Sequence, residues 1–218
     1  RVDPYYWLND RENPEVIAYL EQENSYYQQM TAHTKELQQT LFEEMKSRIK
    51  EDDSSVPYFY NGYFYQTKYE KGQEYPIYIR RKGTLTAKEE VLFNCNEMAK
   101  GKAYFQLGTM SVSPDNKLAA FATDVVSRRL YTIQIKNIET GEILADKIEN
   151  ANPNLVWAED SKTIFYTTKN SKTLRSEKVW KHTIGQEAKA DEMVFFEKDE
   201  TFDVFVSKTK SKKYVLIG

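Results

Sequence analysis

Residues 112–124 read VSPDNKLAAFATD, and this stretch determines the expected fold class. It consists of a strand, a tight polar turn at Asp115-Asn116-Lys117, and a second, largely apolar strand. Three other stretches repeat this order of strand, polar turn and strand: 58–67 around Asn61-Gly62, 156–168 around Asp160-Ser161-Lys162, and 204–217 around Lys210-Ser211-Lys212. The sequence therefore contains one hairpin unit at least four times.

The hairpin at Asn61-Gly62 carries the strongest local signal, since both residues tolerate the positive φ angles of a type I′ turn. The four turns follow one another at intervals of about 45 to 55 residues, which is the blade length of β-propellers. The sequence thus predicts a mainly β fold containing all or part of a propeller.

Fourteen expected strands make about three and a half blades. They are 58–60, 63–68, 77–81 and 91–94 in the first, 108–113, 118–123, 131–138 and 143–146 in the second, 155–158, 164–168, 179–183 and 193–197 in the third, and 202–208 and 213–218 in the half blade. Propellers close with four to eight complete blades. We therefore expect either that the chain is a piece of a longer protein or that several copies complete each other's sheets.

The N-terminal region has helical rather than strand periodicity. Asn13 and Pro14 predict a helix start, and Thr34 is the expected cap of a second helix. Each helix has one apolar face, formed by Val16, Leu20, Tyr27 and Met30 in the first and by Leu37, Leu41, Met45 and Ile49 in the second. Two interpretations are open: a helical hairpin in its own domain, or a strap for a domain outside this sequence.

A charged stretch at 50–55 has linker character and separates the two patterns. The sequence thus predicts an N-terminal helical extension at 1–55 and a partial propeller at 56–218. In the second region, the basic residues at 208–213 lie on an expected hairpin turn, so we interpret them as solvated.

The bulk composition excludes several classes of partner. With 31 basic and 33 acidic residues, the formal net charge is −2, so we expect no binding to nucleic acid or to membranes. Cys95 is the single cysteine and is expected to be half-buried at a strand end. The sequence begins at Arg1 rather than Met, which suggests processing upstream. We expect a cytoplasmic location, with the periplasm as the alternative.

The residues required for catalysis do not form a complete set. The Gly-x-Ser-x-Gly pattern of a nucleophile elbow does not occur, and the two histidines are His33, among the helices, and His182, on an expected strand beside Trp180 and Ile184. The carboxylates look dispersed at turns, and Glu197, Asp199 and Glu200 look solvated. We therefore assign no catalytic, cofactor-binding or metal-binding residue to this chain.

Several short segments nevertheless resemble one family in order and spacing. These segments are 3–8 (DPYYWL), 56–58 (VPY), 61–63 (NGY), 127–131 (SRRLY), 137–141 (NIETG), 179–185 (VWKHTIG), 197–202 (EKDETF) and 209–215 (TKSKKYV). The chain resembles the N-terminal part of the prolyl oligopeptidase family of serine peptidases. The SRRLY and EKDETF segments resemble the oligopeptidase B (protease II) branch more than the proline-specific one.

The resemblance implies a seven-bladed propeller that covers a C-terminal α/β-hydrolase domain, with the N-terminal helices wrapped around the hydrolase. It implies that the parent cleaves short peptides after Lys or Arg and that the propeller excludes folded proteins. The catalytic residues and the acidic specificity pockets would lie in the C-terminal domain. We therefore expect this chain alone to be inactive and to self-associate through its open edges.

Two alternatives are open. One is a proline-specific or dipeptidyl-releasing member of the same family. The other is a free-standing propeller that serves as a protein-interaction module, although this interpretation assigns no role to the helices and leaves the ring open.

Overall fold

The computed structural model describes residues 2–218, and its contacts divide the chain into a helical unit that ends at Glu51 and a sheet unit that begins at Asp52. Residues 53–55 belong to the sheet edge, because the Ser55 N–H donates to the Thr67 carbonyl over 2.9 Å. The boundary between the two units therefore lies four residues before the expected domain boundary at residue 55. The boundary at residue 55 remains a proposal about which residues fold independently.

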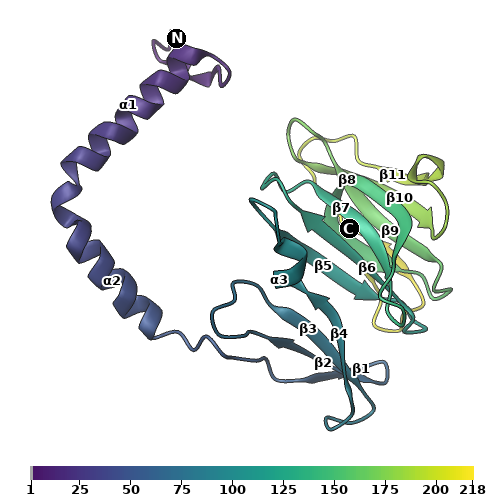
Figure 1. Ribbon diagram of the computed structural model, residues 1–218. Helices are drawn as coiled ribbons and strands as arrows, with labels where there is room; N and C mark the ends of the chain where they lie inside the picture. The colour runs from purple at the N-terminus through teal and green to yellow at the C-terminus, as the bar shows by residue number, and fades with distance from the viewer. Residues whose placement is uncertain (1) are drawn as a thin grey trace. The chain divides into compact units, whose positions relative to one another are not determined.

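The helical unit contains η1 (Tyr6–Asn9), α1 (Pro14–Met30), η2 (Ala32–Thr34) and α2 (Lys35–Ser47). The Asn13 side chain accepts the Glu15 N–H over 2.9 Å, which confirms the expected cap. The expected cap at Thr34 is correctly placed, but its hydroxyl donates to the Thr31 carbonyl over 2.7 Å instead of capping the helix. Figure 1 shows α1 and α2 following one another along a bent path, so the hairpin interpretation is wrong.

Blade 1 is a four-stranded antiparallel sheet of β1 (Tyr58–Tyr60), β2 (Tyr63–Lys68), β3 (Ile77–Lys82) and β4 (Glu89–Asn94). Positive φ angles of 47° at Asn61 and 84° at Gly62 confirm the tight hairpin turn. The short helix α3 (Cys95–Ala99) follows β4 directly. Cys95 therefore begins a helix and is 1% exposed, so the expectation of a half-buried strand-end residue is wrong.

The next seven strands form a single sheet in the order β11-β10-β9-β8-β7-β6-β5. They are β5 (Gln106–Val112), β6 (Leu118–Asp124), β7 (Tyr131–Asn137), β8 (Ile143–Trp157), β9 (Thr163–Lys169), β10 (Ser176–Thr183) and β11 (Glu192–Phe196), with η3 (Ala188–Ala190) before β11. This sheet comprises blades 2 and 3, which share β8.

The continuity of β8 corrects the expectation of separate strands at 143–146 and 155–158. The first part of β8 pairs with β7 and the last part with β9, and the register shifts between Ala151 and Leu155. Asn150, next to this register shift, has a positive φ of 57°. A single strand can therefore serve as the outer strand of blade 2 and the inner strand of blade 3.

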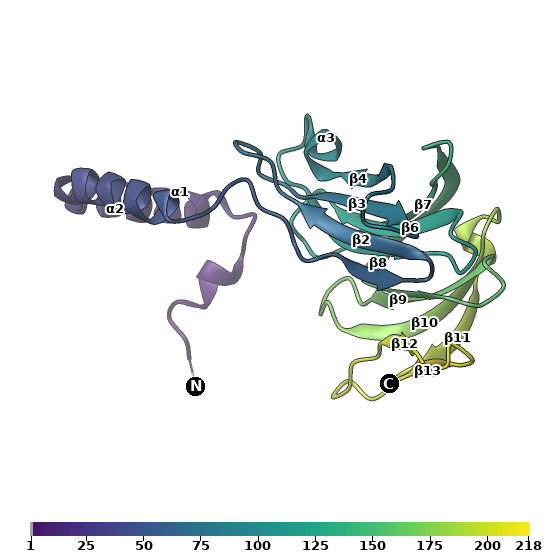
Figure 2. The ribbon, with the colours of Figure 1, turned by 90° about the horizontal axis from the view of Figure 1, so that it is seen from below.

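The half blade consists of β12 (Val206–Lys208) and β13 (Val215–Ile217), both shorter than expected. Phe205 still exchanges two hydrogen bonds with Gly218, of 2.9 and 3.0 Å, but the Val204 N–H donates to the Ser176 carbonyl over 3.0 Å, so the pairing does not extend before Phe205. Figure 2 shows the sheets of this unit arranged side by side from β4 to β13, without closing a ring. The expected mainly β fold, a partial propeller preceded by two helices, is confirmed.

Three hydrophobic cores lie between successive blades. The first contains Phe93 and Phe121, the second Ile133 and Trp157, and the third Val179. Close packing at the second core requires glycine at 108, since a Cβ there would lie 2.3 Å from the Tyr131 ring and 2.7 Å from Pro153. Each blade is therefore stabilised mainly by its neighbours.

Candidate functional site

The two histidines have very different surroundings. His33 lies in η2 of the helical unit, is exposed, and places its Nδ1 3.0 Å from the Met30 carbonyl. His182 lies in β10, is 0% exposed, and belongs to a buried polar cluster. The cluster around His182 is thus the first candidate site.

The His182 ring lies between two aspartates. Its Nδ1 is 2.6 Å from Asp191 Oδ1, and its Nε2 is 2.9 Å from Asp146 Oδ1. Asp146 comes from β8, and Asp191 immediately precedes β11, so the cluster joins three segments of blades 2 and 3. Both carboxylate side chains are almost completely buried, with 3% exposure at Asp146 and 1% at Asp191.

Two further groups complete the cluster. The Tyr166 hydroxyl donates to Asp191 Oδ2 over 2.7 Å, and the Gly185 N–H donates to Asp146 Oδ1 over 2.6 Å. Burial and the adjacent Asp191 carboxylate raise the pKa of Tyr166 well above its usual value. The expectation that carboxylates lie dispersed at turns is therefore wrong for Asp146 and Asp191.

This geometry holds His182 in contacts between strands. Both ring nitrogens of His182 already contact carboxylate oxygens, and the ring has no exposed surface. A general base must lie within hydrogen-bond reach of the group from which it takes a proton. The cluster resembles a buried, fully hydrogen-bonded link between strands, which stabilises the fold only while every member is present.

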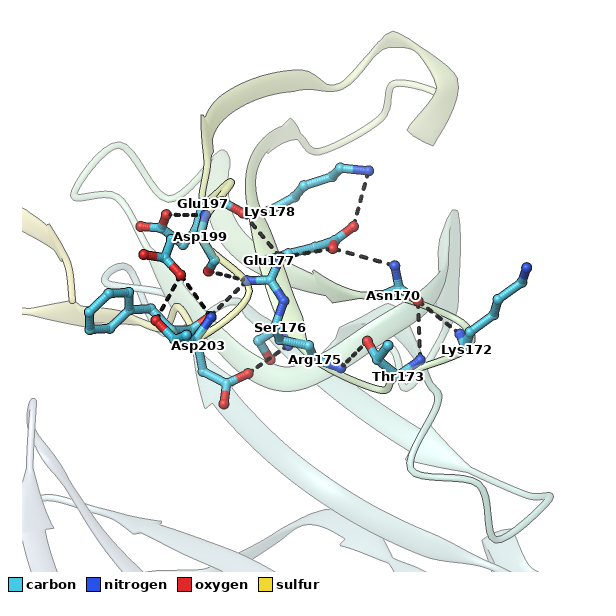
Figure 3. Close-up of polar contacts among 12 residues, drawn as sticks. Asn170, Lys172, Thr173, Arg175, Ser176, Glu177, Lys178, Glu197, Asp199 and Asp203 are labelled. Atoms are coloured by element: carbon cyan, nitrogen blue, oxygen red, sulfur yellow. Dashed lines mark hydrogen bonds and ion pairs between the residues drawn. The ribbon is translucent and has the colours of Figure 1, made fainter. Parts of the chain in front are cut away.

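A second polar cluster surrounds Arg175, at the start of β10 (Figure 3). The Arg175 Nη1 donates to the Phe202 carbonyl over 2.7 Å and to the Asp199 carbonyl over 3.2 Å. Its Nη2 donates to the Glu197 carbonyl and to Glu177 Oε2, each over 3.2 Å. Only 13% of the Arg175 side chain is exposed. One guanidinium therefore orders the connection between β11 and β12.

The acidic residues of this connection are partly as expected. Asp199 and Glu200 are exposed, whereas Glu197 is half-buried and accepts the Asp199 N–H over 2.8 Å. The N–H and hydroxyl of Thr201 both donate to Asp199 and lower the pKa of its carboxyl. Nothing local in the sequence indicates the role of Arg175, because its partners are mostly backbone carbonyls more than 20 residues away.

Polar side chains also link neighbouring blades. The Asn61 amide donates to the Pro114 carbonyl over 2.8 Å, and the Trp157 indole N–H donates to the Ser111 carbonyl over 2.9 Å. Asn154 exchanges two hydrogen bonds with the backbone of Val206, of 2.9 and 2.7 Å. These contacts attach blade 1 to blade 2 and blade 3 to the half blade.

The basic residues at 208–213 are only partly solvated. Lys208 Nζ donates to the Trp157 carbonyl over 2.6 Å and forms an ion pair with Glu159 at 2.5 Å, while Lys212 Nζ lies 4.7 Å from the centre of the Tyr60 ring. The expectation of a wholly solvated turn is therefore wrong for Lys208 and Lys212. Beside this turn lies a recess of about 180 Å³ whose lining includes Tyr60, Trp157, Glu159, Lys208 and Lys212.

The described residues contain neither a metal site nor a helix that could span a membrane. Within residues 2–218, no group of three or more His, Cys, Asp or Glu side chains has the geometry to hold a metal ion. Each described helix is too short or too polar to cross a bilayer.

The comparison with family models decides the assignment. Residues 1–218 match the model described as prolyl oligopeptidase, N-terminal beta-propeller domain. The chain belongs to the prolyl oligopeptidase family. This finding confirms the resemblance derived from the sequence segments, and it identifies the three and a half blades as part of the propeller of a serine peptidase family.

Relatives within the prolyl oligopeptidase family match the whole chain. It is 40% identical to dipeptidyl aminopeptidase BI of Pseudoxanthomonas mexicana and 34% identical to protease 2 of Moraxella lacunata, covering 100% of this chain and 32% of each relative. The structure of oligopeptidase B from Leishmania major matches with a TM-score of 0.92 and 36% identity, over 100% of this chain and 31% of that one. The chain therefore spans about a third of the length of these relatives.

Proposed function

We propose that this chain is the N-terminal part of the propeller of a serine oligopeptidase that cleaves short peptides after Lys or Arg. The observation that carries the proposal is the match to oligopeptidase B from Leishmania major, which extends over the whole chain at 36% identity. In this proposal the catalytic chemistry belongs to a C-terminal α/β-hydrolase domain of the parent, and no residue of this chain takes part in it.

The proposed role of the sheet unit is to restrict the size of substrates. Blades that are joined by buried cores and by contacts such as Asn154 to Val206 form a stiff wall, and a stiff ring excludes folded proteins from a central channel. Short basic peptides would still enter. The supporting observation is that side-chain hydrogen bonds join blade 1 to blade 2, through Asn61 and Pro114, and blade 3 to the half blade, through Asn154 and Val206.

The proposed role of the helical unit is to hold the catalytic domain. Leu37, Leu41, Met45 and Ile49 are 45% to 67% exposed and lie along one face of the second helix region. An apolar stripe of this length marks an interaction surface. The hydrolase domain of the same parent chain is the proposed partner.

A second candidate is release of dipeptides from peptide N-termini, which the 40% identity to dipeptidyl aminopeptidase BI favours. The deciding experiment uses the full-length parent and two chromogenic substrates. One has a blocked N-terminus and Arg before the scissile bond, and the other is a dipeptide with a free N-terminus. Preference for the blocked substrate supports the first proposal, and exclusive cleavage of the free dipeptide overturns it. A blocked substrate with Pro in place of Arg tests the proline-specific alternative.

The location of the chemistry is tested on this chain by itself. We expect no hydrolysis of the basic substrate, and activity only after the separately expressed C-terminal part is added. Activity of this chain alone that is lost in His182→Ala would contradict the proposal, since it would assign a catalytic base to β10.

Self-association is the remaining proposal. Phe205, Tyr214 and Leu216 of the half blade are 48% to 62% exposed, and open sheet edges favour pairing with another chain. Sedimentation at several concentrations measures it. A monomer at every concentration would show that the edges of the half blade do not pair.

A further inference from the structure

A cleft of about 430 Å³ lies between blade 1 and blade 2, away from both polar clusters described above. β4 and α3 form one wall, and β6 and β7 form the other. Phe93, Phe105 and Phe121 line it and are 2% to 4% exposed. Met98 and Ile143 add apolar surface. The cleft is thus an aromatic cavity whose walls are held by two complete blades.

The charged groups of the cleft are predominantly basic. Lys136 Nζ donates to the Leu92 carbonyl over 2.6 Å and lies 5.2 Å from the centre of the Phe93 ring. Lys102 Nζ lies 5.8 Å from the Phe105 ring and donates to the Met98 carbonyl. Among the described residues, neither ammonium pairs with a carboxylate.

The one carboxylate that lines the cleft is already paired. Glu97 Oε2 accepts from Lys100 Nζ at 2.6 Å, on the exposed side of α3. The Lys102 and Lys136 ammonium groups therefore give the cleft a positive charge that no acidic side chain in it balances. The polar side chains of Thr123 and Gln134 also line the cleft.

Lys136 is costly to keep charged in this position. Burial lowers its pKa, and its hydrogen bond to the Leu92 carbonyl leaves two of the three ammonium protons for another acceptor. A carboxylate brought next to Lys136 would offset this desolvation, because an opposite charge favours the charged form. The apolar part of such a ligand would contact the phenylalanine rings.

We propose that this cleft binds an apolar monocarboxylate, with its carboxylate on Lys136 and its hydrocarbon part against Phe93, Phe105 and Phe121. The volume lies within the range of small-molecule pockets, and a mostly apolar lining with a few polar groups is typical of them. The same chemistry is found in a free aliphatic acid and in the C-terminus of a peptide that ends in an apolar residue. The inference does not depend on the peptidase activity.

The test is calorimetric titration of the chain with four probes: octanoate, octanamide, N-acetylphenylalanine and N-acetylphenylalaninamide. We expect at least one carboxylate to bind about tenfold more tightly than its neutral amide, because only the acid can pair with Lys136. Tighter binding of octanoate indicates a free acid, and tighter binding of N-acetylphenylalanine indicates a peptide C-terminus. Equal affinity of acid and amide, or no binding of any probe at millimolar concentration, would overturn the proposal.

Substitutions at Lys136 then test whether the carboxylate binds in this cleft. Lys136→Met should weaken carboxylate binding about tenfold, Lys136→Arg should retain most of it, and Lys210→Met, on the exposed hairpin of the half blade, should leave it unchanged. Unchanged affinity in Lys136→Met would show that the acid binds elsewhere. If Lys136→Met does not fold, the comparison of acid with amide on the original chain and on Lys136→Arg still decides the matter.

Discussion

The helical unit exposes most of its apolar side chains, whereas the sheet unit buries many of its own. Among residues 2–51, Val16 is the single buried apolar residue, whereas the sheet unit buries continuous cores between every pair of neighbouring blades. The apolar stripe of α2, exemplified by Leu41, is exposed. The sheet unit therefore buries much of its apolar surface between its own blades, whereas the helical unit leaves its apolar stripe exposed.

This difference has an energetic basis. An isolated helix shorter than about 12 to 15 residues is marginal in water, and α2 has 13 residues. Most helical stability in proteins comes from packing of the apolar face. Substitutions in the sheet unit should therefore change the unfolding free energy more than substitutions in the helical unit.

The largest effect is expected for His182→Ala. It leaves Asp146 and Asp191 buried without their partner, which typically costs about 3 to 5 kcal/mol of unfolding free energy. Urea denaturation monitored by tryptophan fluorescence measures this loss. Lys181→Ala, at a neighbouring partly exposed position of β10, is the matched control and should cost less than about 0.5 kcal/mol. Similar stability of the two variants would show that the cluster contributes little.

A smaller effect is expected from pH through Cys95. Burial raises the pKa of its thiol from 9.0 to about 11. The folded chain therefore keeps the proton at pH values where the unfolded chain loses it. The stability contributed by the protonated thiol is complete below pH 9 and is lost as the pH rises towards 11.

The measurement is the unfolding free energy from pH 8 to 11. Above pH 9 it should decrease more steeply in the original chain than in Cys95→Ala, with a difference on the order of 1 to 2 kcal/mol. The variant is the control for the titration of tyrosines and lysines. Parallel pH profiles would show that Cys95 does not titrate differently in the folded chain.

In the helical unit, Asn13→Ala should have a local effect. It removes the oxygen that accepts the Glu15 N–H at the start of α1, and losing such a cap costs about 1 kcal/mol of helix stability. Amide hydrogen exchange should become faster in the first turns of α1 and remain unchanged in β6. Asn13→Asp keeps an acceptor and should exchange like the original chain. Faster exchange throughout the sheet unit would contradict the separation of the two units.

The smallest effect is expected for Leu41→Gln. Leu41 is 45% exposed, so the unfolding free energy of this chain should change by less than about 0.5 kcal/mol. The same change in the full-length parent should destabilise it more, because the proposed hydrolase contact would then lose an apolar group. Equal effects in both proteins would instead show that the stripe has no partner in the parent.

The sequence predicted what depends on neighbours along the chain. The Asn61-Gly62 turn and the Asn13 cap are set by two or three residues, and both are confirmed. Most strand positions followed for the same reason, apart from shifts at their ends and from the two expected strands that β8 joins into one. Family membership could also be predicted, because it rests on the order of many short segments.

The sequence did not reveal features that depend on residues far apart in the chain. Asp146 lies 36 residues from His182, and nothing local indicates that the pair is buried. Asn and Pro residues predominate in 150–154, between two expected strands, yet Ala151 pairs with both β7 and β9 and the stretch stays in β8. The aromatic cleft at Lys136 likewise requires two blades to be placed side by side.

The continuity of β8 also bears on the mechanics of the propeller. Because one strand is the outer edge of blade 2 and the inner edge of blade 3, those two blades cannot separate at a flexible joint. Blade 1 and the half blade are instead reached through the loops and turns on either side of this sheet. A pulling force on the two ends should therefore detach blade 1 and the half blade first and leave the seven-stranded sheet as the last element to rupture.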